Sequence, residues 1–218
     1  LANGQASYAF YDENTAGRML SPDDLPDLPA GVSACFFGGI SLMVEPCASA
    51  YAALLTREAG KRTIMIDPNI RPSFIKDEPA YRKRIGAMIA MADIVKVSDE
   101  DLEWLEGAGD LDDLASSLLA KGPKLLCVTR GADGATGYTE RGRVSVPATR
   151  VKVADTVGAG DTFNAGVLAA LHDRGALGKA AVANMGDDAV EAALTRGIRA
   201  AAVTVSRAGA NPPWKDEL

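Results

Sequence analysis

Four short apolar runs, separated by segments with helical spacing, constrain the fold of this chain more than any other feature of its sequence. The runs cover 34–37, 63–67, 94–97 and 125–129, and helical spacing is found over 46–58, over 81–91 and again from 162 onward. Buried strands that alternate with helices form a mainly parallel sheet, because the crossover helices must pack on its faces. The sequence therefore predicts an α/β protein whose central sheet is covered by helices on both sides.

Length, charge and cysteine content narrow the class of protein. The 218 residues suffice for one domain, and a net charge of -6 without a basic stripe argues against a nucleic-acid partner. Cys35, Cys47 and Cys127 are odd in number and widely spaced, so they predict neither a disulfide framework nor a zinc site. The sequence shows no membrane-spanning apolar run and no signal peptide. We therefore expect a cytoplasmic protein without a membrane partner.

One run combines glycines and acids at the start of a predicted helix. It reads Asp155-Thr156-Val157-Gly158-Ala159-Gly160-Asp161. The small residues let a ligand approach the backbone closely, and the free N–H groups of a helix start carry a partial charge of about +0.5. The run therefore predicts an anion cradle, with the carboxylate of Asp161 held beside it.

A carboxylate beside a phosphate site is repulsive unless it has a chemical role. Asp161 can accept the proton of a substrate hydroxyl that attacks a phosphoryl group, while backbone amides stabilise the transferred oxygens. The alternative is that Asp161 only caps the helix and that the glycines only form a turn. Both glycines occur together with the adjacent acid and with Asp155, while Walker-A and Gly-x-Gly-x-x-Gly patterns are absent from the sequence. This combination favours a nucleotide phosphotransferase that is neither a P-loop protein nor a dinucleotide-binding protein.

The segment from Asp155 to Phe163 resembles the C-terminal signature of PfkB-type (ribokinase-like) carbohydrate kinases, and the similarity extends over essentially the whole chain. The resemblance implies a three-layer α/β/α sandwich with a small β lid over the sugar, and ATP as the phosphoryl donor. It implies that Asp161 is the general base. It also implies that the anion hole is formed by Gly158, Ala159 and Gly160.

The same resemblance implies two cation sites. A monovalent cation, K⁺, is expected at Asp155, the Val157 carbonyl and the loop that runs from Thr204 to Gly209; Pro213 stands where ribokinase has a hydroxyl ligand. Magnesium is expected, through water, near the segment that replaces the family's Asn-x-x-Glu motif. There the candidates are Glu100 and Asp101 for the metal and Ser98 for the nucleotide. Capping of the helix by Ser98 is an open alternative.

Two turns that follow buried strands are further candidates for nucleotide contacts. Thr129, Gly131 and Gly134 lie in a segment that looks like the family's nucleotide-contacting turn, although any strand followed by a hairpin can use such glycines. Arg71 ends a segment that resembles the Asp-x-Asn-x-Arg segment of fructokinases and follows a strand end, where parallel sheets place ligands. Its guanidinium can pair with phosphate oxygens, and a turn built by the neighbouring prolines is the alternative.

The sugar acceptor is predicted from the lid region, which is expected over residues 5–17. Kinases for 2-keto-3-deoxygluconate carry an arginine just after paired aromatics, where this chain has Asp12. A carboxylate there repels an acidic sugar, so a neutral sugar, fructose, is the predicted acceptor. 2-Keto-3-deoxygluconate, ribose and nucleosides are alternatives within the family, and pairing of lids makes a homodimer a further expectation.

The predicted domain covers residues 1–218 as a ribokinase-like kinase domain that lacks its N-terminal portion. The family's N-terminal Gly-Gly motif is absent, and Gly38-Gly39 lies on a later strand. An alternative of another class is therefore an inactive relic that still binds nucleotide or sugar.

Overall fold

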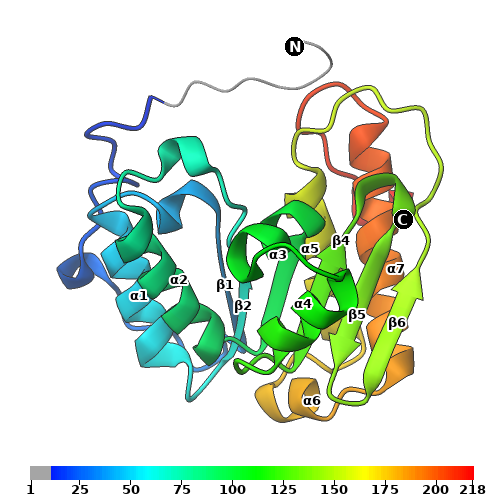
Figure 1. The fold of residues 1–218 in the computed structure, drawn as a ribbon, viewed down its shortest axis with the longest axis horizontal. Helices are drawn as coiled ribbons and strands as arrows, with labels where there is room; N and C mark the ends of the chain where they lie inside the picture. Colours follow the sequence, from blue (N-terminus) through cyan, green and yellow to red (C-terminus); the bar gives the residue numbers. More distant parts are fainter. Residues whose placement is uncertain (1–10) are drawn as a thin grey trace.

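A mixed sheet of six strands forms the centre of the computed structural model, which describes residues 11–218 (Figure 1). The strands lie in chain order across the sheet: β1 (Ala34–Gly38), β2 (Thr63–Asp67), β3 (Ile94–Ser98), β4 (Leu125–Thr129), β5 (Ala135–Thr139) and β6 (Gly142–Val146). Strands β1 to β4 are parallel, with Ala34 opposite Thr63 and Ile94 opposite Leu125. β5 and β6 are antiparallel additions at one edge.

Helices cover both faces of this sheet, as Figure 1 shows. One layer consists of α1 (Cys47–Glu58), α2 (Glu78–Met91), α3 (Asp99–Glu106) and α4 (Leu111–Leu119), and the other of α5 (Ala159–Asp173), α6 (Lys179–Ala183) and α7 (Asp187–Val205). Short 3₁₀ turns occupy Pro22–Asp24, Gly39–Leu42, Pro72–Phe74, Gly131–Asp133 and Lys215–Glu217. The predicted three-layer α/β/α architecture is confirmed.

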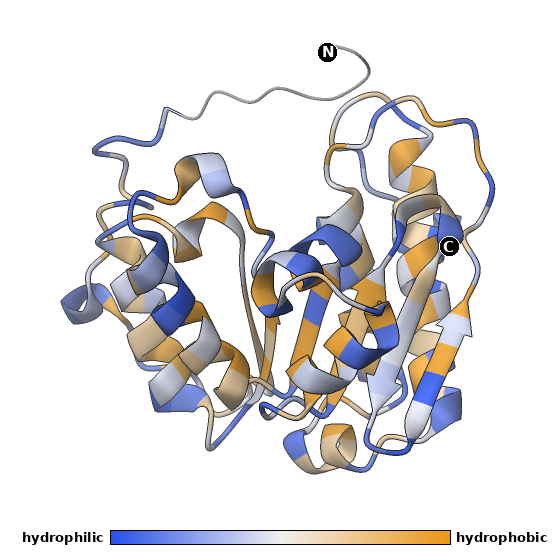
Figure 2. Ribbon diagram, viewed as in Figure 1, coloured by the Kyte–Doolittle hydropathy of each residue, from blue (hydrophilic) through white to orange (hydrophobic). Residues whose placement is uncertain are grey.

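The alternation of side chains along each strand divides the core into two clusters. In β2, Ile64 and Ile66 pack in the cluster beneath α1 to α4, while Met65 packs in the cluster beneath α5 and α7. Both sides of a central parallel strand are therefore apolar, which explains the unbroken hydrophobic runs in the sequence. Figure 2 shows the result as hydrophobic colour along the inner parallel strands, whereas β5 is mostly pale. Lys96 in β3 is an exception, and it lies on the α5 side of the sheet, next to the start of α5.

The element boundaries follow local capping chemistry that periodicity alone does not reveal. The second helix was expected over 81–91 but begins at Glu78, because the Asp77 side chain accepts a hydrogen bond from the N–H of Ala80 and Pro79 occupies the first turn. α4 was not predicted; the Asp110 side chain caps it at the N–H groups of Asp112 and Asp113. Of the lid region expected over 5–17, residues 5–10 lie outside the described residues, and residues 11–17 form turns and irregular backbone without a strand.

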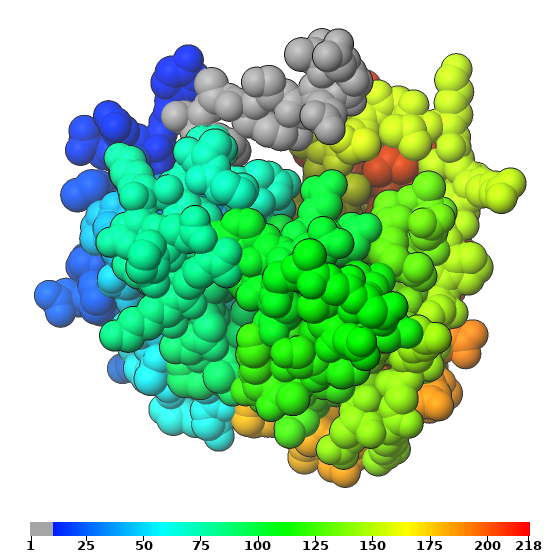
Figure 3. Space-filling model, viewed as in Figure 1, coloured from blue at the N-terminus to red at the C-terminus, as the bar shows by residue number. Residues whose placement is uncertain are grey.

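The carboxyl ends of the parallel strands meet at one edge of the sheet. The segment after β2, the start of α3 and the start of α5 all lie at this edge, at the top of Figure 1. In the space-filling view the same edge is indented between the segment near residue 70 and the loop that precedes α5 (Figure 3). Ligands of open α/β sheets bind at such an edge. Among the helices of residues 11–218, none has the length and apolar character needed to cross a bilayer.

Candidate active site

The first turn of α5 has the structure of an anion cradle. Gly158 is the residue before the helix and adopts φ = +79°, a left-handed conformation that favours glycine, and it offers no side chain as a cap. The Gly158 carbonyl accepts hydrogen bonds from the Thr162 N–H at 2.9 Å and from the Thr162 hydroxyl at 2.7 Å. The N–H groups of Gly160 and Asp161 donate to no described residue. They are available to an anionic ligand.

Asp161 is the third residue of α5, and its side chain is exposed. Its carboxylate takes part in no hydrogen bond or ion pair with the described residues of the chain. Together with the unpaired N–H groups of the same turn, it forms a base beside an anion site. The structure brings these groups together, and the roles of base and anion hole for residues 158–161 stay predictions.

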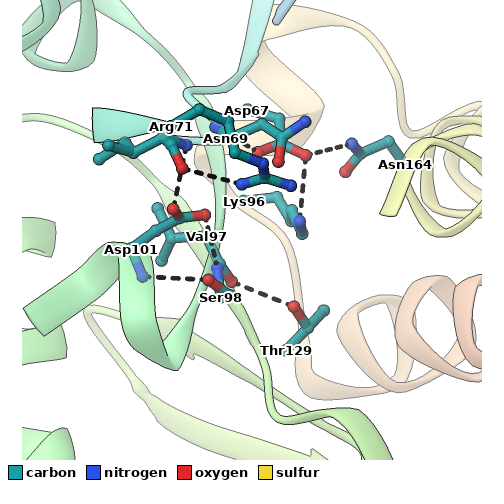
Figure 4. A network of polar contacts seen from close by, with 10 residues as sticks. Asp67, Asn69, Arg71, Lys96, Val97, Ser98, Asp101, Thr129 and Asn164 are labelled. Carbon is teal, nitrogen blue, oxygen red and sulfur yellow. Dashed lines mark hydrogen bonds and ion pairs between the residues drawn. The ribbon is translucent and has the colours of Figure 1, made fainter. Parts of the chain in front are cut away.

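A buried polar cluster, drawn in Figure 4, lies against this turn. One oxygen of Asp67, Oδ2, accepts hydrogen bonds from Lys96 Nζ at 3.1 Å and from Asn164 Nδ2 at 2.7 Å, while Oδ1 accepts from the N–H of Asn69 at 3.0 Å. Asp67, Lys96 and Asn164 are 3%, 5% and 2% exposed. A Cβ atom added to Gly160 would lie 3.2 Å from Lys96 Nζ. The cluster therefore joins the end of β2 and the middle of β3 to the first two turns of α5.

The N-terminus of α3 is capped by the side chains of Ser98 and Asp101. The Ser98 hydroxyl accepts from the Asp101 N–H at 3.0 Å, and Asp101 Oδ2 accepts from the Ser98 N–H at 3.3 Å, which completes a capping box. Asp101 Oδ1 accepts from the N–H of Ile70 at 3.0 Å, so this helix also holds the segment after β2. Burial raises the pKa of Asp101, and the backbone bond from Ser98 acts in the opposite direction. The capping alternative is thus present in the structure.

Glu100 is the exposed carboxylate of the same turn. Asp101 is 6% exposed and both of its oxygens accept backbone hydrogen bonds, which leaves Glu100 as the better candidate for a water-mediated magnesium contact. Among residues 11–218, no group of three or more His, Cys, Asp or Glu side chains is arranged as a direct metal site.

Arg71 lies at the sheet edge with its side chain exposed. Within the described part of the chain its guanidinium bonds only to the carbonyl of the neighbouring Ile70, at 2.8 Å. Asn69 adopts φ = +44° in the tight turn that leads to it. Four of the five guanidinium N–H donors are therefore left for an anion or for solvent.

The turn after β4 contains the other nucleotide candidates. The Thr129 hydroxyl donates to the Val97 carbonyl at 3.3 Å, which ties the ends of β4 and β3 together. Gly131 has φ = +50° and open space where a Cβ would stand. An added Cβ at Gly134 would lie 2.1 Å from the Val146 carbonyl, so Gly134 is required for packing of the β-hairpin. Of the two glycines, Gly131 is the one whose backbone a ligand can approach.

Asp155 connects two loops at the site predicted for a monovalent cation. Its Oδ1 accepts from the N–H of Val157 at 3.1 Å, and its Oδ2 accepts from the N–H of Gly209, whose φ is +69°, at 3.0 Å. Both backbone bonds lower the pKa of Asp155, and the bond from Val157 has the larger effect. Thr204 is buried in α7, and its hydroxyl bonds to Thr162 and Ala200, so the hydroxyl already has its partners within the helices. Asp155, Val157 and Gly209 are brought together; the Thr204 side chain is not part of the group.

Sequence reasoning missed Lys96 and Asn164. A lysine in the middle of the apolar run 94–97 was the available signal, because a buried charge needs a partner and Asp67 ends the neighbouring strand. Asn164 gave a weaker signal, since it only interrupts an apolar helix face.

Comparison with known proteins identifies the family of this chain. The chain matches the pfkB family carbohydrate kinases over residues 4–217. A fructokinase of Rhizobium leguminosarum bv. trifolii is 55% identical over 190 residues, which cover 87% of this chain and 58% of the relative. A fructokinase of Solanum tuberosum is 36% identical over 221 residues, which cover 99% of this chain and 64% of the relative. The chain thus spans about three fifths of the length of these relatives.

Solved structures show the same architecture. A fructokinase with bound ATP from Xylella fastidiosa superposes with a TM-score of 0.85 at 25% identity and covers 95% of this chain, which in turn covers 66% of that structure. An aminoimidazole riboside kinase from Salmonella enterica, in complex with aminoimidazole riboside and an ATP analogue, superposes with a TM-score of 0.73 at 33% identity, over 87% of this chain and 61% of that structure. With a family match over nearly all of its residues, the chain belongs to the pfkB family of carbohydrate kinases.

Proposed function

We propose that this chain forms the nucleotide-binding and catalytic part of a fructokinase, which transfers the γ-phosphoryl group of ATP to a hydroxyl of fructose. The observation that carries the proposal is the exposed carboxylate of Asp161 beside the unpaired N–H groups of Gly160 and Asp161. A base and an anion cradle in one helical turn are the two elements that phosphoryl transfer to an alcohol requires.

In this mechanism Asp161 accepts the proton of the attacking sugar hydroxyl. The amides of the turn that includes Gly158, Ala159 and Gly160 stabilise charge on the transferred phosphoryl oxygens. Arg71, in the segment after β2, pairs with phosphate oxygens. Gly131 lets the nucleotide approach the backbone after β4. The N–H groups of Gly158, Gly160 and Asp161 and most donors of the Arg71 guanidinium are unpaired among the described residues, whereas the Ala159 N–H donates to the Thr156 carbonyl at 3.3 Å.

Two cations belong to the proposal. Glu100 would hold magnesium through water, and the bound metal would neutralise part of the phosphate charge. A monovalent cation, K⁺, would be held by Asp155 and by carbonyl oxygens of the two loops that Asp155 joins, including that of Val157. The donor set fits such a cation because each carboxylate oxygen keeps a lone pair beside the one used for the backbone bond.

The choice of fructose rests mainly on the relatives. The carboxylate of Asp12, from which the sequence argument predicted repulsion of acidic sugars, is 3.0 Å from Arg18 Nη1. Its charge is partly compensated by this ion pair, so the repulsion is weaker than the sequence indicated. The names of the two curated relatives favour fructose. The riboside kinase among the structural matches makes a nucleoside the second candidate acceptor.

The test is a coupled assay of ADP release by the full-length gene product with fructose, ribose, 2-keto-3-deoxygluconate and a nucleoside as acceptors. We expect the highest kcat/KM with fructose. A higher value for the sugar acid or for the nucleoside would assign the acceptor to another member of the family. Nucleotide binding without turnover of any acceptor would favour the inactive, nucleotide-binding alternative.

A further inference from the structure

Lys96 is a buried cation in an unusual position. It lies in β3 between Val95 and Val97, both 0% exposed, and is itself only 5% exposed. Its ammonium pairs with Asp67 Oδ2 at 3.1 Å. Removing one partner of such a pair leaves an uncompensated buried charge, whereas a buried pair adds little net stability compared with apolar residues. The presence of the pair therefore calls for an explanation other than stability.

The ammonium of Lys96 lies against the start of α5. An added Cβ at Gly160, the second residue of that helix, would be 3.2 Å from Lys96 Nζ. A cation at a helix N-terminus is unfavourable, because the helix dipole already places a partial positive charge there. The combination becomes favourable when an anion binds to the helix start. Lys96 thus adds positive potential at the place where the transferred phosphoryl group would lie.

The cluster is incompletely satisfied in the described chain. Lys96 has three N–H donors, and Asp67 is the one acceptor that residues 11–218 provide. Oδ1 of Asn164 is buried and has no hydrogen-bond partner in the same part of the chain. Groups that only stabilise a core are normally fully paired. The unused N–H donors of Lys96 beside Gly160 indicate a site whose electrostatics are completed by an anionic ligand.

We propose that Lys96, held by Asp67, is a positioning residue of the phosphoryl-transfer site. Its charge strengthens the amide cradle of residues 158–160, and Asp67, through Asn164, fixes the turns of α5 that carry Asp161. The inference rests on the proposed kinase function and adds to it a residue that acts through the cradle rather than by contact with the sugar.

A double variant tests this role, because it removes both charges and so avoids an unpaired buried ion. In the full-length protein, Lys96→Met with Asp67→Asn is expected to lower kcat by about 10- to 100-fold, below the loss from deleting one direct oxyanion donor. The KM for the sugar is expected to stay within about threefold, because Lys96 acts on the phosphoryl group and not on the acceptor. Asn164→Ala, which leaves the ion pair in place, is expected to lower kcat about fivefold by the same reasoning.

The matched control is a second lysine–aspartate pair away from the cradle. Lys179 Nζ contacts Asp93 Oδ2 at 2.7 Å, and Asp93 also accepts from the Ile64 N–H, much as Asp67 accepts from Asn69. Lys179→Met with Asp93→Asn should leave kcat within about twofold of wild type. If the Lys96 double variant and Asn164→Ala also retained wild-type kcat, a purely structural role would be established and the proposal overturned.

Phosphate binding separates this inference from the kinase assignment. Inorganic phosphate is titrated into the isotope-labelled full-length protein, and the NMR amide signals of Gly158 and Gly160 are followed. The Lys96 double variant is expected to bind at least about fivefold more weakly than wild type, through loss of the buried charge. Equal affinities would overturn the inference even if wild type phosphorylates fructose. Weaker binding in the variant would support it even if wild type turned over no sugar.

Discussion

The helices α3 and α5 begin at the same edge of the sheet, and each carries an aspartate as its third residue. Asp101 of α3 is 6% exposed, and its two oxygens accept from the backbone N–H groups of Ser98 and Ile70. Asp161 of α5 is exposed and has no hydrogen bond or ion pair within residues 11–218. The same residue type at the same helix position is therefore structural in one case and available for chemistry in the other.

The residue before each helix accounts for this difference. Ser98 has a hydroxyl that accepts from the Asp101 N–H, so the first turn of α3 satisfies its own donors. Gly158 has no side chain and a left-handed backbone, so the N–H groups of Gly160 and Asp161 remain open. An acidic first turn is thus not evidence of a ligand site by itself; the cap decides whether the helix start is free.

The strongest test of this comparison is removal of the base from α5. Asp161→Asn keeps the shape of the side chain and removes its proton affinity, so kcat should fall by about 10²- to 10⁴-fold, the usual contribution of a general base. ATP affinity and the free energy of unfolding should change little, because the side chain bonds to no described residue. Steady-state kinetics with urea denaturation would measure both quantities.

Asp113→Asn is the matched control for Asp161→Asn. Asp113 is an exposed aspartate at the third position of α4, so the substitution makes the same change of charge at the same position of another helix. We expect near-wild-type turnover. Near-wild-type turnover in Asp161→Asn as well would show that Asp161 only complements the helix dipole.

The comparison also shows how far the sequence predicts this protein. The parallel strands and the uncapped helix start at residues 158–161 were predictable, because apolar runs and glycines express local physical constraints. The structural role of Asp101 was not predictable, because it depends on a hydrogen bond from the N–H of Ile70, thirty-one residues away along the chain. Lys96 and Asn164 likewise meet Asp67 only through the fold. Long-range pairing of polar groups carries no periodic signal, so it appears only when the strands and helices are assembled.

Removal of the buried acid from α3 should lower the free energy of unfolding, the quantity that Asp161→Asn should leave nearly unchanged. Asp101→Asn leaves one oxygen where two donors converge, so either Ser98 or Ile70 loses its acceptor, at a cost of about 1–3 kcal/mol in the free energy of unfolding. Asp99→Asn, in the same turn but without these bonds, should cost much less. Equal urea midpoints for the two variants would contradict the structural role of Asp101.

The pH dependence of stability gives a further check on the role of the Asp101 carboxylate, when wild type is compared with Asp101→Asn. Burial raises the pKa of Asp101 in the folded protein above its ordinary value of 3.8, so the folded state binds more protons than the unfolded state between these two values. The contribution of Asp101 to stability is therefore greatest below the unfolded pKa and decreases as pH rises through the folded pKa. The difference in stability between wild type and Asp101→Asn should shrink over that range. A difference that grew with pH would mean that the hydrogen bonds to the carboxylate outweigh its burial.

The smallest effect concerns the glycine that leaves α5 uncapped. Gly158→Ala places a side chain at φ = +79°, and Gly175→Ala does the same at φ = +65° just after the other end of α5. Each should lower the free energy of unfolding by about 1–2 kcal/mol, because a left-handed backbone is strained for alanine. Only Gly158→Ala should also lower kcat, because relief of its strain shifts the amides that Asp161 needs beside it. If both variants lost stability equally and neither lost turnover, the left-handed turn would matter for folding alone. The difference between α3 and α5 would then lie in Asp161 and not in its cap.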